Sequence, residues 1–299
     1  MTLDCTSSTP TIESGPLAGR SQWKMAWQSL RKNVTAMIGL AGLILLVVVT
    51  LLAPWLSPFD PTSMDVGHLM TRPDQVHLFG TDDLGRDVLS RVLWGGRESL
   101  RVAILAMAIA MSGGVIVGLI SGFYDGLVDN IIQRLSEVFL AFPSILLLLT
   151  IVAVFGPSLS TVLLALGMSS IPSYGRLVRG SVLEAVARDY VLAARAVGVG
   201  NRGIMFRHIL PNVIGPVIVY TTVGLGGAIM TTAGLSYVGL GAQPPSPEWG
   251  AMLNYGRGYL REAWWMSIFP GLAIFIAVLS VNLLGDGLRD AFDPKSRVV

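Results

Sequence analysis

Charge is scarce in this sequence. Asp, Glu, Lys and Arg make up only 13% of its 299 residues, whereas 52% are hydrophobic; a soluble domain carries about 25% charged residues. This composition excludes an ordinary soluble fold, because so large an apolar surface would aggregate in water. The net charge of +2 is small and gives no reason to expect a nucleic-acid partner.

Residues with reactive or ligating side chains are equally few. The single cysteine, Cys5, cannot form an internal disulfide and leaves the redox compartment open. None of the three lysines follows the glycine pattern of a phosphate-binding loop, so the chain cannot hydrolyse ATP by that route. His68, His77 and His208 are not spaced as metal ligands. We therefore expect no catalytic residue, no cofactor-binding residue and no metal site.

Uncharged runs are abundant. Five of them contain no Asp, Glu, Lys or Arg: 34–57, 102–124, 138–175, 209–247 and 263–285. A membrane-spanning helix needs about 20 apolar residues. The run of 38 residues would extend roughly 57 Å as one helix, which is too long, and Gly156-Pro157 divides it. The pattern predicts an all-α, polytopic membrane protein with six transmembrane helices, at about 34–57, 102–124, 136–155, 159–178, 213–240 and 263–285.

The N-terminal part of the chain changes character twice. Residues 1–20 are rich in Ser, Thr, Pro and Gly, which predicts a disordered tail. Within 21–33, the side chains of Trp23, Trp27 and Leu30 share one helical face, which predicts a helix lying in the membrane interface. A frayed leader to the first span is the alternative. The 24 uncharged residues that follow exceed the apolar core of a signal peptide, so we expect a retained span.

Lys and Arg residues beside the spans predict the orientation. With the N-terminus in the cytoplasm, fourteen of them lie on the cytoplasmic side and seven outside. This asymmetry predicts that both termini and the loop 179–211 are cytoplasmic. A cluster of arginines between Arg86 and Arg101 runs against the rule, and acidic residues such as Asp82 and Asp87 lie among them.

The largest connection between spans, residues 58–100, is expected outside. Val88 and Val92 belong to an apolar stripe that predicts a short surface helix, packed on the outer rim of the bundle. Thr81 or Asp82 is expected to cap that helix. Direct contact with a substrate is the alternative function of this segment.

The segment 189–212 is a basic island between two apolar stretches. Residues 190–197 predict a short, alanine-lined helix, and Asn201 is expected to cap a second helix that ends at Pro211. Two glycines fit the left-handed end of the first helix: Gly198 and Gly200. A narrow helix at the tip of a loop has the shape to enter a groove on another protein. An amphipathic hairpin resting on the bilayer is the alternative.

Four segments resemble the permease subunits of bacterial ATP-binding-cassette (ABC) importers. They are residues 79–100, 189–212, 234–253 and 269–295, and they resemble the second, C-type permease of the dipeptide, oligopeptide and nickel group. The resemblance extends over about residues 25–295. In that family the loop corresponding to 189–212 docks onto an ATPase. The ATPase-coupling residues that the resemblance implies are Leu192, Ala193, Ala194, Arg195, Gly198, Leu210 and Pro211, with Leu192 standing where the family usually has Glu.

The resemblance implies a type I importer permease-like bundle that does no chemistry itself. Its expected partners are a second permease subunit, two ATPase subunits that bind the ATP, an extracytoplasmic substrate-binding protein and membrane lipid. The chain would form half of a path for di- or oligopeptides across the bacterial cytoplasmic (inner) membrane. The resemblance leaves the solute open among dipeptides, oligopeptides, glutathione and nickel.

These expectations divide the chain into four parts: a cytoplasmic tail with its interfacial helix (1–33), the first span with the outer segment (34–101), a core of five spans with the coupling loop 179–211 (102–287), and a cytoplasmic tail (288–299). A stand-alone secondary transporter or channel is the competing function, and it predicts buried charges or internal symmetry. A membrane enzyme, the third possibility, would need a catalytic constellation. Co-purification with an ATPase separates the first from the other two.

Overall fold

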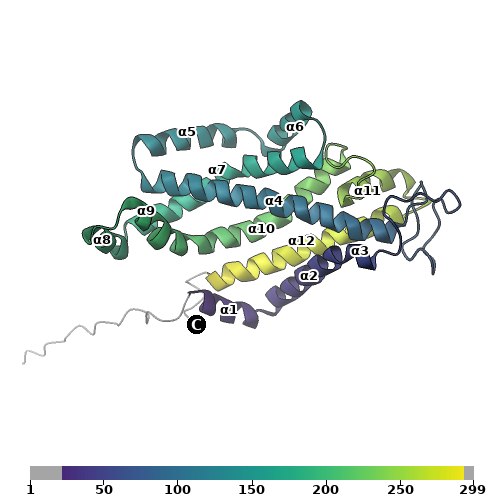
Figure 1. Ribbon diagram of the computed structural model, residues 1–299, viewed down its shortest axis with the longest axis horizontal. Coiled ribbons are helices and arrows are strands. Elements are labelled where there is room, and N and C mark those ends of the chain that lie inside the picture. The colour runs from purple at the N-terminus through teal and green to yellow at the C-terminus, as the bar shows by residue number, and fades with distance from the viewer. Residues whose placement is uncertain (1–21, 293–299) are drawn as a thin grey trace, which may run out of the picture.

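The computed structural model describes residues 22–292, and within that range every regular element is a helix (Figure 1). This confirms the all-α prediction for the described part of the chain. The predicted disordered tail 1–20, with Cys5, lies outside the described residues, as do residues 293–299 of the C-terminal tail. The helices are α1 (Gln22–Lys32), α2 (Val34–Leu51), α3 (Ala53–Leu56), α4 (Val88–Phe123), α5 (Leu127–Ala141), α6 (Ser144–Phe155), α7 (Leu159–Val186), α8 (Asp189–Ala196), α9 (Asn201–Gly203), α10 (Leu210–Tyr237), α11 (Trp249–Gly256) and α12 (Trp265–Phe292).

Two long parallel helices, α4 and α7, form the centre of the bundle (Figure 1). A Cβ atom added at Gly114, Gly118 or Gly122 of α4 would overlap Tyr174, Val178 or Val182 of α7. The contacts recur every four residues on both helices, so they form one continuous seam. Small residues allow membrane helices to approach closely, because van der Waals packing rather than the hydrophobic effect holds such helices together.

Helix α4 is much longer than the sequence pattern indicated. Its 36 residues begin at Val88, so the predicted short surface helix is the first part of one continuous helix that crosses the predicted boundary at 101/102. The predicted N-cap was wrong. Asp87 caps α4 instead: its carboxylate accepts a hydrogen bond from the Ser90 backbone N–H (2.8 Å) and another from the Ser90 hydroxyl (2.7 Å).

Among the described helices, four are long and apolar enough to cross a membrane: α2, α4, the continuous helix Asn201–Tyr237 that ends as α10, and α12. The pair α5 and α6 makes a fifth when counted together. The predicted count of six is therefore not confirmed. The remaining candidate, α7, has 28 residues but carries serines, Pro172 and two arginines, which make it less apolar than the others.

The span predicted at about 136–155 is not a single helix. Helices α5 and α6 meet at an angle of 87°. Phe142 and Pro143 between them have extended ψ angles of 137° and 121°. Pro143 causes the break, because proline disfavours the helical conformation in the residue before it and has no N–H to continue the helix. The predicted break at Gly156-Pro157 is confirmed, with Gly156 at φ 87° after the end of α6.

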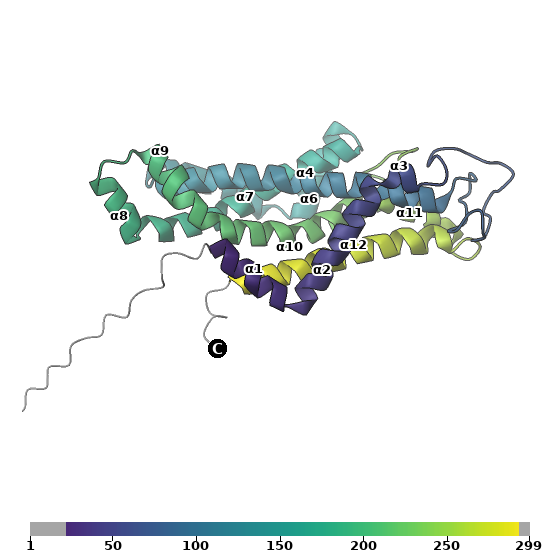
Figure 2. The same ribbon diagram turned by 60° about the horizontal axis from the view of Figure 1, so that its bottom comes forward.

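Helices α1 and α2 pack across α12 at the periphery of the bundle (Figure 2). Ala26 and Leu30 of α1 are buried in a small cluster with Leu284 and Ala291 of α12, whereas Trp27 on the neighbouring face is half exposed. The amphipathic helix predicted for 21–33 is thus confirmed as a helix. Part of its apolar face contacts protein, and its contact with the membrane interface stays a prediction.

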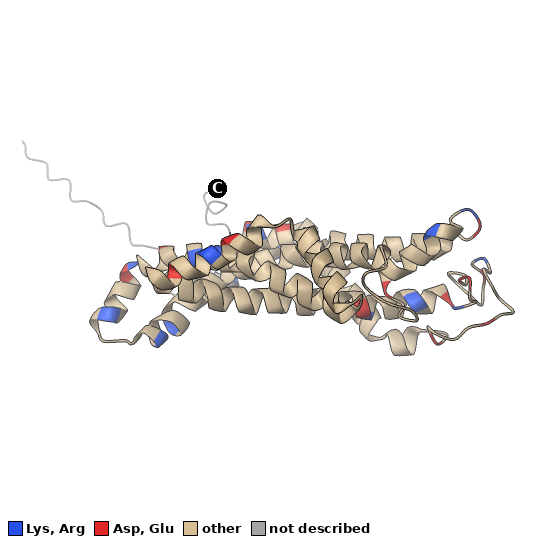
Figure 3. Cartoon of the chain, turned by 90° about the horizontal axis from the view of Figure 1, so that it is seen from above, with Lys and Arg blue, Asp and Glu red and all other residues tan. Residues whose placement is uncertain are grey.

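The connection between α3 and α4 folds over the end of the bundle together with α11. Trp265 of α12 donates its indole N–H to the carbonyl of Thr81 (2.9 Å), and the Trp249 indole donates to the carbonyl of Val92 (2.8 Å). Charged residues gather toward the two ends of the molecule and leave a largely uncharged stretch between them (Figure 3). That distribution is what a protein embedded across an apolar layer requires.

Candidate functional site

The predicted coupling loop projects as a short helical hairpin from one end of the bundle, which we call the α8 end (Figure 1). Helix α8 ends in a Schellman motif. The Val199 N–H donates to the carbonyl of Ala194 (3.0 Å), and the Gly198 N–H donates to the carbonyl of Arg195 (3.0 Å). Gly198 has φ 81°, which confirms the left-handed end predicted there. The same prediction for Gly200 is wrong, because its φ is −68°.

The second arm of the hairpin differs from the prediction. Gly200, not Asn201, is the N-cap of α9, and the helix does not end at Pro211. It continues through a π-helical segment, Ile204–Ile209, directly into α10, where Pro211 is the second residue. The Leu210 N–H bonds to the carbonyl of Met205, five residues back. This wider turn lets the chain enter α10 although Pro211 has no N–H to donate.

The loop has its own small core. Val191 and Ala194 of α8 are buried, as are Ile204 and Met205 of the second arm. Ala194 is only 6% exposed. Its methyl group therefore packs inside the hairpin between the two arms, and the role of Ala194 in ATPase coupling stays a prediction.

The remaining predicted residues divide between outward and inward positions. Leu192 is 52% exposed, and Ala193, Gly198 and Pro211 are exposed as well. Leu210 is half-buried and packs against the main core. The Arg195 guanidinium is exposed and lies over the ring of Phe123 at the end of α4, 5.7 Å from its centroid. Arg195 thus ties α8 to the bundle through a cation–π contact.

Two exposed apolar side chains in the loop were missed by the sequence analysis. Val197 is 79% exposed and Phe206 is 58% exposed. Together with Leu192 and Ala193 they define the exposed loop face. The sequence did carry a signal for them: Val197 and Phe206 lie in a basic segment outside the predicted spans, where a large apolar side chain has no membrane to enter. Exposed apolar residues on one surface mark sites of protein contact.

An ion pair connects α7, which leads into the loop, to α5. The Arg179 guanidinium donates to both oxygens of the Asp129 carboxylate, at 2.7 Å and 2.5 Å. Asp129 also accepts a hydrogen bond from the Ser121 hydroxyl of α4, and Gln133 donates to the same hydroxyl at 2.9 Å. Asp129 is buried, so this paired, bidentate contact fixes three helices near the α8 end. The sequence analysis did not foresee it, because it placed Asp129 outside the spans.

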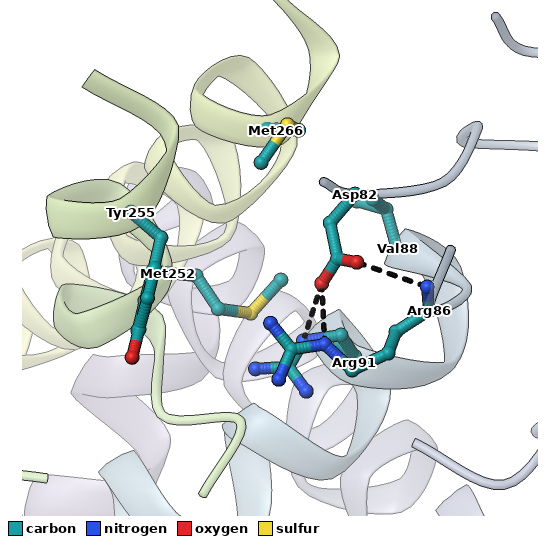
Figure 4. Close-up of a pocket in the computed structure, with 7 residues that line it drawn as sticks. All are labelled: Asp82, Arg86, Val88, Arg91, Met252, Tyr255 and Met266. Carbon is teal, nitrogen blue, oxygen red and sulfur yellow. Dashed lines mark hydrogen bonds and ion pairs between the residues drawn. The ribbon is translucent and has the colours of Figure 1, made fainter. Parts of the chain in front are cut away.

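At the opposite end, two arginines of the cluster that ran against the orientation rule, Arg86 and Arg91, belong to an internal network (Figure 4). The Asp82 carboxylate pairs with Arg86 at 2.7 Å and with Arg91 at 3.6 Å, and all three side chains are buried. The Arg91 guanidinium also donates to the carbonyl of Pro61 (2.9 Å). These arginines stabilise the folded outer segment, so they act as partners of buried carboxylates rather than as topology signals.

The outer histidines have structural partners. His77 is buried and its Nδ1 lies 2.9 Å from Asp87, which caps α4, while His68 lies 2.8 Å from Asp65. The His68 side chain lowers the pKa of the Asp65 carboxyl, chiefly through this hydrogen bond. Within residues 22–292, no group of three or more His, Cys, Asp or Glu side chains is arranged to hold a metal ion.

A helical bundle with an uncharged middle, a folded outer segment at one end and a helical hairpin at the other defines a polytopic membrane transport subunit. The chain belongs to the family of binding-protein-dependent transport system inner membrane components, whose family model matches residues 114–298. Residues 21–73 match the N-terminal transmembrane domain of oligopeptide transport permease C. It is therefore a multi-pass inner-membrane permease subunit, as the sequence resemblance predicted.

Curated relatives match nearly the whole chain. The di/tripeptide transport system permease protein DppC of Pseudomonas aeruginosa is 43% identical, over 92% of this chain and 93% of that protein. The dipeptide transport system permease protein DppC of Alkalihalophilus pseudofirmus is 42% identical, over 93% and 91%. The glutathione transport system permease protein GsiD of Escherichia coli is 43% identical, over 92% and 91%.

A solved structure shares the fold. A chain of the methionine ABC transporter MetNI, in an inward-facing conformation, aligns with a TM-score of 0.54 at 20% sequence identity. The alignment covers 68% of this chain and 96% of that one. This likeness confirms the predicted type I importer permease-like bundle at the level of the fold.

Proposed function

We propose that this chain is one of two permease subunits of an ATP-driven importer for di- and oligopeptides. Three relatives that match over 90% of their length are named for di/tripeptides, dipeptides and glutathione, and all of these solutes contain amide bonds. The remaining partners follow from the proposal: a second permease, two ATPase subunits that bind and hydrolyse ATP, and an extracytoplasmic binding protein that delivers the solute.

The proposed orientation puts both termini and the α8 end in the cytoplasm. The excess of basic residues on that side supports it, fourteen against seven over the whole sequence. Two of the seven outer arginines, Arg86 and Arg91, are buried in ion pairs with Asp82. When the buried Arg86 and Arg91 are left out of the count, the excess of basic residues on the cytoplasmic side becomes larger.

We assign α7 as the sixth crossing. Its 28 residues extend about 42 Å at roughly 1.5 Å per residue, enough for an apolar layer about 30 Å thick. It runs parallel to α4, with α5 and α6 returning the chain between them, and is packed against α4, α5, α6 and α10. Because protein covers much of its surface, its serines and Pro172 need not face lipid, and a lower mean hydropathy is acceptable there.

The observation that carries the proposal is the exposed loop face, formed by Leu192, Ala193, Val197 and Phe206 beyond the end of the bundle. ATPase closure would push on this face, and α7 and α10, which continue directly from the loop, would transmit the movement. The solute path would then open to one side of the membrane at a time. An apolar Leu192 where the family usually has Glu indicates that the groove on the ATPase is apolar at this position.

The test compares two neighbouring alanines in the assembled complex. Ala193→Asp places a carboxylate on the exposed loop face, where docking would bury it without a partner at about 3 kcal/mol or more, equivalent to roughly 100-fold weaker binding. We expect ATPase co-purification and peptide uptake to be lost while the permease still inserts. Ala193→Ser is the matched control and should retain both activities.

Ala194→Asp gives the contrasting result. This carboxylate would be buried inside the hairpin's own core, so the loop itself should become sensitive to proteolysis even without the ATPase.

The purified permease alone should hydrolyse no ATP. Wild-type ATPase co-purification and uptake with Ala193→Asp would show that the exposed loop face does not dock the ATPase.

A further inference from the structure

A cavity lies on the inner side of the break between α5 and α6. It measures about 450 Å³, is open on one side and is lined by residues of α5, α6, α7 and α10. Phe139 and Phe142 line it on the side of the break. Five hydroxyl side chains also line it: Ser144, Ser169, Ser170, Ser173 and Thr231. No residue in its described lining carries a charge.

The hydroxyls are concentrated where the rest of the bundle is apolar. Ser169, Ser170 and Ser173 lie near the middle of α7, within the proposed crossing. The hydroxyls of Ser169 and Ser170 donate to the Leu166 carbonyl, at 3.2 Å and 2.8 Å. Each hydroxyl oxygen still has lone pairs to accept a hydrogen bond from a donor in the cavity. The lining can therefore exchange hydrogen bonds with a polar molecule.

The helix break is an independent sign that the cavity is wet. The last carbonyls of α5 and the first N–H groups of α6 have no helical partner across the 87° bend at Pro143. Non-helical backbone at membrane depth is stable only where protein covers it or a water-filled cavity adjoins it. Phe142, Pro143 and Ser144 are all exposed, so no part of this chain covers the break, and we infer that the second condition applies here.

The cavity continues toward the outer end of the molecule. A second cavity of about 640 Å³ shares Thr231 with the first and follows α6 and α10 as far as Leu240. Its lining includes Gly234 and Val238, at the C-terminal end of α10. The two cavities together follow the last part of α10, from Met230 and Thr231 to Leu240 just beyond its end.

We propose that the hydroxyl-lined cavity at the α5–α6 break is this chain's share of the solute path and contacts the amide groups of a passing peptide. The assignment rests on the proposed import function. Neutral hydroxyls can donate to and accept from amide groups whatever the peptide's side chains are. A path must hold its solute weakly enough to release it, and a lining without fixed charge meets that requirement.

The cavity is also connected to the coupling loop. Helix α7 carries Ser169 and Ser173 in its middle and Arg179 nearer its cytoplasmic end, and Arg179 pairs with Asp129 of α5. Helix α5 in turn carries Phe139 of the lining. A movement of the loop that shifts α7 would therefore move two walls of the cavity together.

Cysteine accessibility in the assembled transporter tests the assignment. In a Cys5→Ser background, Ser169→Cys and Ser173→Cys are treated with a charged, water-soluble methanethiosulfonate reagent, with and without alanyl-alanine and trialanine. Both cysteines should react, and the peptides should slow the reaction. Val162→Cys, on the same helix but outside the lining and fully buried in the bundle, should stay unreactive, because protein covers the thiol.

A size series provides the second measurement. Ser173→Ala should leave peptide uptake near wild type, whereas Ser173→Leu should lower it about tenfold or more, the effect of a misfitting group in a fitted pocket. ATPase co-purification should not change in either variant.

The outcomes separate this assignment from the import function. Inert cysteines at 169 and 173 in a transporter that still takes up peptide would overturn the path assignment alone. Labelling that peptides do not slow would overturn the peptide contact. A wild-type complex that neither binds the ATPase nor takes up peptide would remove the import function and the path assignment with it.

Discussion

Gly198 has the backbone conformation that ends α8. At φ 81° an L-residue is strained, and the strain is of order 1–3 kcal/mol. The space around it is open, so a larger side chain would meet no neighbouring atom. The requirement for glycine at this position is therefore conformational and not steric.

This leads to a prediction at the residue scale. Gly198→Val should loosen the Schellman motif, tilt α8 and weaken ATPase docking roughly tenfold or more, since about 1.4 kcal/mol corresponds to tenfold. The measurement is ATPase co-purification from membranes with equal permease content. Gly200→Ala is the control: Gly200 has φ −68° and open space around it, so this change should have little effect. Equal docking by both variants would contradict the role of Gly198.

The sequence predicted the conformation of Gly198 but not the burial of Ala194. The left-handed turn at Gly198 was predictable, because glycine after a short helix is the usual way to form it. The burial of Ala194 was not, because α8 has alanine at three of its eight positions and only the second arm of the hairpin determines which methyl is covered.

At the scale of helices, the Arg179–Asp129 pair joins the arm of the coupling loop to the broken helix. Each partner comes from a different element, and Asp129 receives further hydrogen bonding from Ser121 of α4. Since α5 has an amphipathic sequence and ends at the Pro143 bend, the ion pair is the main polar contact that holds it against α7.

We expect Arg179→Gln and Asp129→Asn each to lower the thermal midpoint of the purified permease, because hydrogen bonds between charged groups contribute about 1.5–3 kcal/mol. The double variant should lose less than the sum of the two, since the second change removes a partner already unpaired. Arg188→Gln is the control, because the Arg188–Glu184 pair is exposed and contributes little. Strict additivity of the two single changes would contradict a direct coupling.

The helix boundaries show where local patterns are insufficient. Uncharged runs located every long helix, but they did not reveal that α4 starts at Val88, since its first turns contain Arg91, Arg97 and Arg101. The Arg91 charge is tolerated because Asp82, from a separate turn, pairs with it. A hydropathy pattern does not reveal such an ion pair, even between residues this close in the sequence.

For the whole molecule, the proposed topology predicts which surfaces face outward. In a Cys5→Ser background, single cysteines are placed at three exposed positions: Ser63 and Gln243 at the outer end, and Arg202 in the coupling loop. A membrane-impermeant thiol reagent applied to intact cells should label 63 and 243 and spare 202. Permeabilised cells, in which all three should react, are the control. Labelling of 202 from outside would invert the orientation.

The sequence by itself determined the class of this protein. Its uncharged runs, its lack of a phosphate-binding loop and four family-like segments were enough for an all-α membrane permease subunit, because membrane insertion depends on local hydropathy. The bend between α5 and α6 has a local cause in Pro143, which the sequence analysis did not use. The tertiary structure alone decided the burial of Ala194 and the Arg179–Asp129 pair. These features depend on contacts between residues far apart in the chain, and a helix shows no sign of its neighbours until they pack against it.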